Sequence, residues 1–269
     1  MLRCGRNWRP ASVKRVIETF ETSTRVAQVA TDAGNGFLKG IGNPAGPMSL
    51  VAELVAGELA AWIGLIIPDF SIIHVTGIDI PFGNGAHVQH GPAFISREID
   101  GFGGNGGPDF IRKISNPSDI AKLVVFDTWI RNADRCHPDP ENYPPNYDNL
   151  FFTPNGQKYE LVALDHSQGF IESGIEAALS DPYVVEDDQV YGFFPEFAAL
   201  IDYTSVTAAV ARLRQIDTAQ VQEIVDSIPP QWGISSGTRV VLRNVICERA
   251  NRVANYISAK LLSNPGLEV

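Results

Sequence analysis

Ten residues near the middle of the chain read Phe126-Asp127-Thr128-Trp129-Ile130-Arg131-Asn132-Ala133-Asp134-Arg135, the end of a predicted helix and the start of a loop. Two strands are predicted after that loop, over Asn149–Thr153 and Tyr159–Leu164, and Asp165 follows the second. Taken singly, such polar residues are more often caps of helices and turns. Taken together, Asp134, Asn149 and Asp165 can converge on one cation. An oxygen-only set suits a hard ion that keeps water ligands, Mg²⁺ or Mn²⁺.

The first third of the chain alternates short apolar runs with turn residues, which is typical of strands. Strands are predicted over Val16–Phe20, Arg25–Val29, Gly36–Lys39, Phe70–Val75 and Ala93–Ile99, and a helix over Met48–Ile63. Lys39 ends a strand, and Glu53 lies in an apolar part of the helix, where a buried carboxylate needs a partner. Glu58 is the rival acid, five residues on and therefore on another face of the helix.

A glycine-rich segment, Gly101 to Gly107, interrupts regular structure and is the predicted boundary between two lobes. Beyond it the pattern becomes helical. Asn116 is predicted to cap a helix that starts at Pro117 and runs to about Arg131. Further helices are predicted over Ser205–Ile216, Thr218–Ile228 and Thr238–Leu262, the second with a capping box at Asp217 and Gln220. The sequence therefore predicts an α+β fold with a strand-rich lobe, residues 1–100, and a mainly helical lobe, residues 101–269.

The order of the polar residues suits phosphoryl transfer. That chemistry needs a cation on the nucleotide phosphates, acids that hold Mg²⁺ and a carboxylate that orients the acceptor hydroxyl. A strand lysine such as Lys39, paired with a helical glutamate such as Glu53, supplies the first requirement. The glycines of 101–107 do not supply a phosphate loop, because they lack the Gly-Lys-Ser/Thr ending and do not lead from a strand into a helix.

Several short segments occur in the order found in a known family. They are Phe37-Leu38-Lys39, Glu53-Leu54-Val55-Ala56-Gly57-Glu58-Leu59-Ala60, Asn132-Ala133-Asp134-Arg135, Asp148-Asn149-Leu150 and Leu164-Asp165-His166-Ser167. In this order the chain resembles the HipA-like kinases, and the phosphoinositide lipid kinases carry a similar pattern. The resemblance covers most of the chain. It implies a two-lobed protein-kinase-like fold that binds ATP and Mg²⁺ between its lobes.

The resemblance also implies roles for individual residues. Lys39 would contact the α- and β-phosphates with Glu53 holding it, and Asp134 would be the catalytic carboxylate. Asn149 and Asp165 would bind the metal. The adenine would meet backbone after Ser96 and Arg97, and the turn Glu21-Thr22-Ser23-Thr24 would lie over the phosphates.

The chain departs from the family pattern between the two parts of the expected site. Protein kinases separate the catalytic aspartate from the metal-binding asparagine by a few residues, whereas here the excursion Cys136–Asp148 intervenes. Asn142 and Asn146 therefore rival Asn149, which is preferred because it is predicted to open a strand. Relatives often place a histidine after the Asp-Arg pair, but this chain has Cys136 and then His137.

The composition limits the classes of partner and the cellular location that are expected for this protein. The formal charge of −10 argues against a broad nucleic-acid surface, which needs clustered Lys and Arg. The most apolar stretch, Leu50 to Ile67, contains two glutamates and reads better as a core helix than as a membrane span. The three cysteines are far apart and odd in number, which favours a reducing, cytoplasmic location.

The expected function is therefore an ATP- and Mg²⁺-dependent kinase acting on a Ser or Thr hydroxyl of an unidentified protein acceptor. Three alternatives stay open from the sequence: a kinase for a small molecule or lipid headgroup, an AMP transferase on the same fold, and an inactive nucleotide-binding module that serves interactions.

Overall fold

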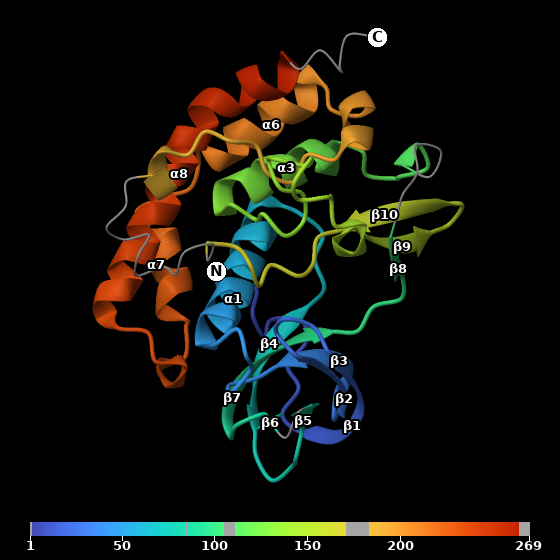
Figure 1. Ribbon diagram of the computed structural model, residues 1–269, viewed down its shortest axis with the longest axis vertical. Coiled ribbons are helices and arrows are strands. Elements are labelled where there is room, and N and C mark those ends of the chain that lie inside the picture. The colour runs from blue at the N-terminus through green and yellow to red at the C-terminus, as the bar shows by residue number, and fades with distance from the viewer. Residues whose placement is uncertain (1, 84–85, 105–110, 171–182, 264–269) are drawn as a thin grey trace.

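We describe a computed structural model of the chain, covering residues 2–83, 86–104, 111–170 and 183–263. The N-terminal lobe is built on an antiparallel sheet in the order β1-β2-β3-β7-β4 (Figure 1). Its strands are β1 (Val13–Phe20), β2 (Val26–Thr31), β3 (Gly34–Lys39), β4 (Phe70–Val75) and β7 (Gly91–Arg97), with a small β5 (Pro81–Gly83) and β6 (Ala86–His87) pair beside them. These bounds agree closely with the predicted strands.

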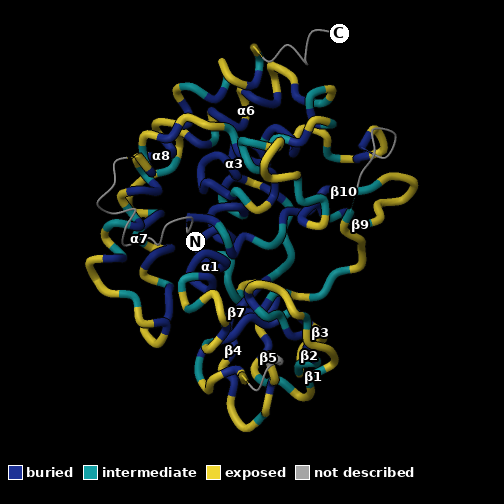
Figure 2. Tube along the Cα trace, viewed as in Figure 1, coloured by how far each residue is buried: buried dark blue, intermediate teal, exposed yellow. Residues whose placement is uncertain are grey.

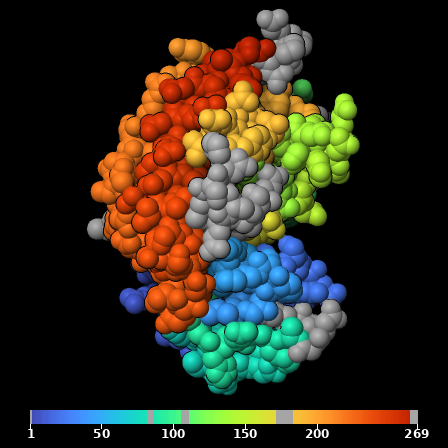
Figure 3. Space-filling model, turned by 60° about the vertical axis from the view of Figure 1, so that its left-hand side comes forward, coloured from blue at the N-terminus to red at the C-terminus, as the bar shows by residue number. Residues whose placement is uncertain are grey.

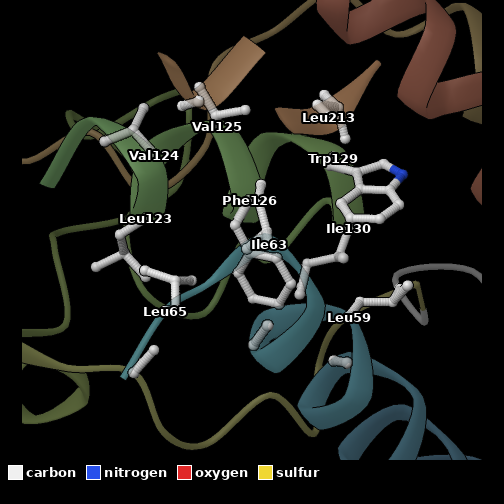
Figure 4. Packing of buried hydrophobic residues seen from close by; sticks show 14 of the residues in the cluster. Leu59, Ile63, Leu65, Leu123, Val124, Val125, Phe126, Trp129, Ile130 and Leu213 are labelled. Carbon is white, nitrogen blue, oxygen red and sulfur yellow. The ribbon is translucent and has the colours of Figure 1, made fainter. Parts of the chain in front are cut away.

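Helix α1 (Pro47–Ile63) lies between this sheet and the helices of the other lobe. It is buried around nearly its whole circumference, which explains its continuous apolar sequence. Gly64 ends it in the left-handed conformation, with φ of 89°. Its Ile63 lies beside Phe126 of the next long helix, α3 (Ser118–Ile130), in the main hydrophobic core (Figure 4).

The start of α3 differs by one residue from the prediction. Pro117 occupies the cap position, so Asn116 precedes it. The Asn116 side chain instead accepts a hydrogen bond from the Leu161 backbone N–H at 2.8 Å and donates to the Leu161 carbonyl at 3.0 Å. Asn116 is therefore used to join α3 to a strand, a contact that a local capping pattern cannot reveal.

A second, smaller sheet of order β10-β9-β8 lies in the C-terminal lobe, formed by β8 (Phe102–Gly103), β9 (Phe151–Asn155) and β10 (Lys158–Val162). Asn149 was predicted to open a strand, and this prediction is wrong. The residue ends a 3₁₀ turn, η1 (Tyr147–Asn149), just before β9. The turn arises because the amide N–H groups of Asn149 and Leu150 bond back to Asn146 and Tyr147. The glycine-rich segment was predicted to interrupt all regular structure, which is wrong for Phe102–Gly103, because these residues pair with β9 as β8; residues 105–107 of the segment lie outside the described residues.

The remaining elements are helical: α5 (Tyr183–Glu186), η2 (Pro195–Ala199), α6 (Tyr203–Leu213), α7 (Thr218–Asp226), η3 (Pro230–Trp232) and α8 (Ser236–Leu262). The predicted capping box of α7 is present, with the Asp217 side chain accepting from the Gln220 N–H at 2.7 Å. Figure 2 shows that α1 and α3 are buried along most of their length.

The C-terminal third also reaches the N-terminal lobe. In Figure 3 the orange and red part of the surface extends from the top of the molecule down to the blue and teal surface of the N-terminal lobe. One contact is specific: the indole N–H of Trp232 donates to the carbonyl of Pro92 on β7 at 2.8 Å. The architecture is the predicted one, a β-rich N-terminal lobe and a mainly helical C-terminal lobe.

Candidate active site

Three predicted site residues lie together: Glu53 and Asp165 both contact the side-chain nitrogen of Lys39. Lys39, the last residue of β3, has its side-chain nitrogen in contact with a carboxylate oxygen of Glu53 on α1 and 3.0 Å from Oδ1 of Asp165. The other Glu53 oxygen accepts the backbone N–H of His166 at 3.3 Å. Lys39 is only 6% exposed. The strand, the helix and the segment after β10 are therefore joined through the buried Lys39 and Glu53 and the half-buried Asp165.

The electrostatics of this cluster keep the lysine charged. Burial alone would lower the pKa of Lys39, but the carboxylates of Asp165 and Glu53 outweigh it and the pKa is raised. Burial opposes ionisation of Asp165 as well, yet Lys39 holds its pKa well below the ordinary value. Burial raises the pKa of Glu53, with Lys39 opposing that effect. The site thus presents a buried ammonium beside an ionised aspartate.

Asp165 itself has an unusual backbone conformation. Its φ of 53° lies in the left-handed region, which non-glycine residues seldom adopt. Residues held in this way cluster at functional sites, where the surrounding structure enforces them. Here the enforcing contacts are the Lys39 ion pair and the Ser167 hydroxyl, which donates to Asp165 Oδ1 at 2.8 Å.

Asp134 and Asn149 form the second part of the site. The Asn149 side-chain amide donates to Oδ2 of Asp134 at 2.7 Å and lies 3.4 Å from its carbonyl oxygen. Asn149 is buried, whereas Asp134 is exposed. Because Asp134 uses the amide NH₂, the amide oxygen is the atom of Asn149 that could bind a cation.

A cavity of about 250 Å³ lies beside the Lys39 cluster. Its lining contains Lys39, Glu53, Ser96, Arg97 and Asp165 together with Val26, Phe37, Gly57, Ile67, Pro68, Phe70, Phe94, Ile99, Phe151, Ala163, Leu164 and His166. A larger cavity of about 450 Å³ lies between the N-terminal segment, the end of α1 and α7, but it contains none of the predicted site residues. The smaller cavity is the better ligand site, because it combines an apolar lining with converging charges.

Some predicted residues lie outside this lining. Asp134 and Asn149 do not border the cavity, and neither do Thr22, Ser23 and Thr24. The turn that contains the latter three connects β1 to β2 and is closed by a hydrogen bond from the Arg25 N–H to the Thr22 carbonyl at 3.1 Å. Its place over the phosphates remains a prediction.

Residues that the sequence offered as alternatives to the site residues have other contacts in the structure. Glu58 accepts the backbone N–H groups of Arg3 at 2.7 Å and Cys4 at 2.8 Å, so it anchors the N-terminal segment and not a ligand. Asn142 is exposed and bonded to Asp139 within the excursion. Cys136 is buried, and burial raises the pKa of its thiol to about 12, so this cysteine is not a reactive group beside the loop.

Sequence comparison is consistent with this geometry. A family model for HipA-like kinases matches residues 15–260. The chain belongs to the HipA-like kinase family. Among solved structures it is similar to the crystal structure of the Helicobacter pylori proinflammatory kinase CtkA, with a TM-score of 0.60 and 11% identity over 94% of this chain and 98% of that chain. At this identity the likeness shows a shared fold. No curated protein matches the sequence.

HipA-like kinases are expected to use Mg²⁺ with ATP, and the donor set of this chain fits that ion. In the described part of the chain no group of three or more His, Cys, Asp and Glu side chains could hold a metal by itself. The oxygen donors expected for it are the Asp165 carboxylate and the amide oxygen of Asn149, and these would hold the ion. Mg²⁺ is commonly bound by one or two protein ligands while waters and substrate phosphates complete its shell.

Among the described residues, no helix has both the length and the apolar character required to cross a bilayer.

Proposed function

We propose that this HipA-like kinase transfers a phosphoryl group from Mg²⁺-bound ATP to a Ser or Thr hydroxyl of a protein. The observation that carries the proposal is Lys39, a buried ammonium held between Glu53 and Asp165 at the edge of a cavity. A cation in this setting suits the phosphates of a nucleotide, while the adjacent acid suits the metal that accompanies them.

The cavity lining fits the remainder of the nucleotide. Apolar side chains from both lobes, including Phe37, Phe94 and Phe151, provide surfaces for a flat base. Ser96 and Arg97 end β7 at the cavity, so the backbone that follows them is in reach of the base edge. We assign the nucleotide-binding lobe to residues 1–100 and the catalytic lobe to residues 101–269, with ATP between them.

In the proposed mechanism Lys39 binds the α- and β-phosphates, and Glu53 orients the lysine. Asn149 and Asp165 would hold Mg²⁺, which supplies neutralisation of the phosphate charge when bound. Asp134 orients the acceptor hydroxyl and accepts its proton as the hydroxyl oxygen bonds to the γ-phosphorus, while the bond from that phosphorus to the bridging oxygen of the β-phosphate breaks and ADP leaves. The hydrogen bond from Asn149 fixes one oxygen of Asp134 and leaves the other for the acceptor.

A protein acceptor is favoured by the surroundings of Asp134. This residue is exposed, and the tip of the excursion that follows it, residues 140–144, is exposed as well. An open surface of this kind admits a polypeptide, whereas a small metabolite is usually enclosed on most sides. A cytoplasmic location, supported by the cysteine spacing, remains part of the proposal.

The experiment is mass spectrometry of the purified protein and a lysate incubated with γ-labelled ATP and Mg²⁺. We expect a mass gain of phosphate on Ser or Thr, formed at a rate lower by a factor of about 10² to 10⁴ with Asp134→Asn. A gain of AMP would assign the protein to nucleotide transfer, and labelling of a small molecule or lipid alone would exclude the protein acceptor. No transfer to any of these, with ATP still bound, would establish the inactive binding module.

A further inference from the structure

Arg135 is the residue directly after Asp134, and its side chain points into the protein. It is fully buried, with 0% exposure. Its Nε donates to Oδ2 of Asp127 on α3 at 2.7 Å, and that aspartate is fully buried too. The same carboxylate accepts the Asn132 side-chain amide on its other oxygen at 3.1 Å. The charge of Arg135 is thus neutralised inside the helical lobe.

The two terminal nitrogens of Arg135 reach the other parts of the site. One donates to the backbone carbonyl of Asn149. The other donates to the carbonyl of Leu164, the residue before Asp165, at 3.0 Å. One guanidinium therefore connects the segments that contain Asp134, Asn149 and Asp165. The two carbonyls that it contacts lie 14 and 29 residues after Arg135 in the sequence.

We propose that Arg135 is a positioning residue that fixes Asp134, Asn149 and Asp165 at the mutual spacing required to bind Mg²⁺ with ATP. The proposal rests on the proposed function of the same site. Only a guanidinium has the planar set of five donors that can serve a carboxylate and two carbonyls at once. Because all its acceptors are fixed by α3, the η1 turn and the end of β10, a shift of one segment is transmitted to the others.

The matched variants are Arg135→Lys and Arg249→Lys. Arg249 is also fully buried and donates to backbone carbonyls, but its acceptors are Thr128, Trp129, Val184 and Asp187, none of them in the three site segments. Both changes keep the charge and remove the fork of donors, so both lower the melting temperature. A purely structural role would make the two variants behave alike in every other measurement.

Two measurements separate them. The first is calorimetric titration of ATP at a series of Mg²⁺ concentrations: Arg135→Lys raises the Mg²⁺ concentration for half-maximal binding by about tenfold or more, as is typical when the support of a metal ligand is lost. Its affinity for ATP without Mg²⁺ stays within about twofold of the parent protein, and Arg249→Lys leaves the Mg²⁺ requirement unchanged. The second is amide hydrogen exchange of the ligand-free protein, where Arg135→Lys speeds exchange over residues 147–150 and 164–167 and Arg249→Lys does not.

If Arg135→Lys does not fold, Asp127→Asn replaces it, because the asparagine oxygen still accepts from Arg135 without fixing it by charge. A smaller change in the same two measurements is then expected. The opposite result is a folded variant with the same Mg²⁺ requirement and the same hydrogen exchange as a parent protein that binds ATP with Mg²⁺ normally. That result overturns the role of Arg135 and leaves the proposed function standing. Failure of the parent protein to bind ATP with Mg²⁺ overturns the proposed function, and this inference with it.

Discussion

His166 follows Asp165 and is packed in the interior at 3% exposure. Its ring meets the edge of Phe126 at a centroid distance of 5.4 Å, and within the described residues its buried Nε2 has no hydrogen-bond partner. Burial, assisted by the nearby charge of Arg135, lowers the pKa of His166 to about 3. His166 is therefore a neutral packing residue beside the Lys39 cluster.

The neutral state of His166 predicts a pH-dependent stability. In the unfolded chain a histidine gains its proton near its ordinary pKa of 6.5, whereas the folded protein does not admit the proton until about pH 3. Stability from this residue is thus complete above pH 6.5 and lost as the pH falls toward 3. Between about pH 7.5 and pH 5 its share of the loss is about 2 kcal/mol.

Urea unfolding of the parent protein and of His166→Phe at these two pH values measures that share. The phenylalanine keeps the ring contact with Phe126 and does not titrate. We expect the parent protein to lose about 2 kcal/mol more than the variant. Equal losses would mean that His166 is protonated in the folded protein.

Substitutions of Asp165 and Asp134 are predicted to have different effects on ATP binding and on transfer. Asp165→Asn removes a metal-binding carboxylate, so Mg²⁺-dependent ATP affinity and transfer should fall together. Asp134→Asn removes the group that orients the acceptor, so ATP should bind almost normally while transfer falls by a factor of about 10² to 10⁴. Asp226→Asn, on the surface-facing α7 where it bonds to Gln222, is the control and should change neither.

Titration of ATP with and without Mg²⁺, beside a transfer assay, tests both assignments. Loss of metal-dependent binding in Asp134→Asn with normal binding in Asp165→Asn would reverse the two roles. If neither variant differs from the parent protein, the kinase assignment itself is wrong.

At the scale of the element, the excursion Cys136–Asp148 is anchored at its ends and exposed at its tip. Cys136 is buried and its thiol donates to the Phe193 carbonyl at 3.2 Å, and the Asn146 N–H donates to the Arg135 carbonyl at 2.9 Å. Between these anchors, a hydrogen bond from the Tyr143 N–H to the Asp139 carbonyl at 3.0 Å turns the chain back. The tip can therefore change without disturbing the site residues on either side.

Shortening the tip tests its proposed role beside the acceptor. Replacement of Pro140–Pro144 by two glycines should leave ATP binding unchanged, because Asn146 and the η1 turn are retained. The rate of transfer to a protein acceptor should change. The control is a Gly-Ser tip of the original length, which separates the effect of the tip's length from that of its sequence. Weaker ATP binding in the shortened protein would show that the tip supports the nucleotide site instead.

At the scale of the whole molecule, one ion pair joins the two sheets. Lys39 ends β3 of the five-stranded sheet, and Asp165 follows β10 of the three-stranded one, with 3.0 Å between their charged atoms. ATP bound as proposed at this point would contact both lobes and would stabilise the folded state by mass action. At a concentration of 100 times its dissociation constant, the gain is about 2.7 kcal/mol.

Lys39→Ala should reduce that gain. If the variant binds ATP about tenfold more weakly, the same ATP concentration gives about 1.4 kcal/mol, which thermal or urea unfolding with and without Mg²⁺ and ATP will resolve. Lys122→Ala is the control, because Lys122 is also paired with an acid, Asp119, but does not border the cavity. An equal gain in Lys39→Ala and the parent protein would contradict the assignment of Lys39 to the phosphates.

The sequence alone determined the elements whose signals are local. The β4 strand, the helix over 48–63 and the capping box of α7 were all predicted, because apolar periodicity and end-capping depend on residues within a few positions. The order of the short polar segments was equally visible. That order sufficed to indicate the family and the two lobes.

The Lys39–Glu53 pair was expected from the sequence, but only the tertiary structure showed that Asp165 joins it and what the remaining polar groups contact. Glu58 faces away from Lys39, as its position on the helix predicts, but its contact with the backbone of Arg3 and Cys4 joins residues more than fifty positions apart and has no local signal. The task of Arg135 is likewise invisible in sequence, since two of its three acceptors are backbone carbonyls and carry no side-chain signal. Charges and carbonyls distant along the chain become partners only when packing removes water around them, and that is a property of the folded molecule.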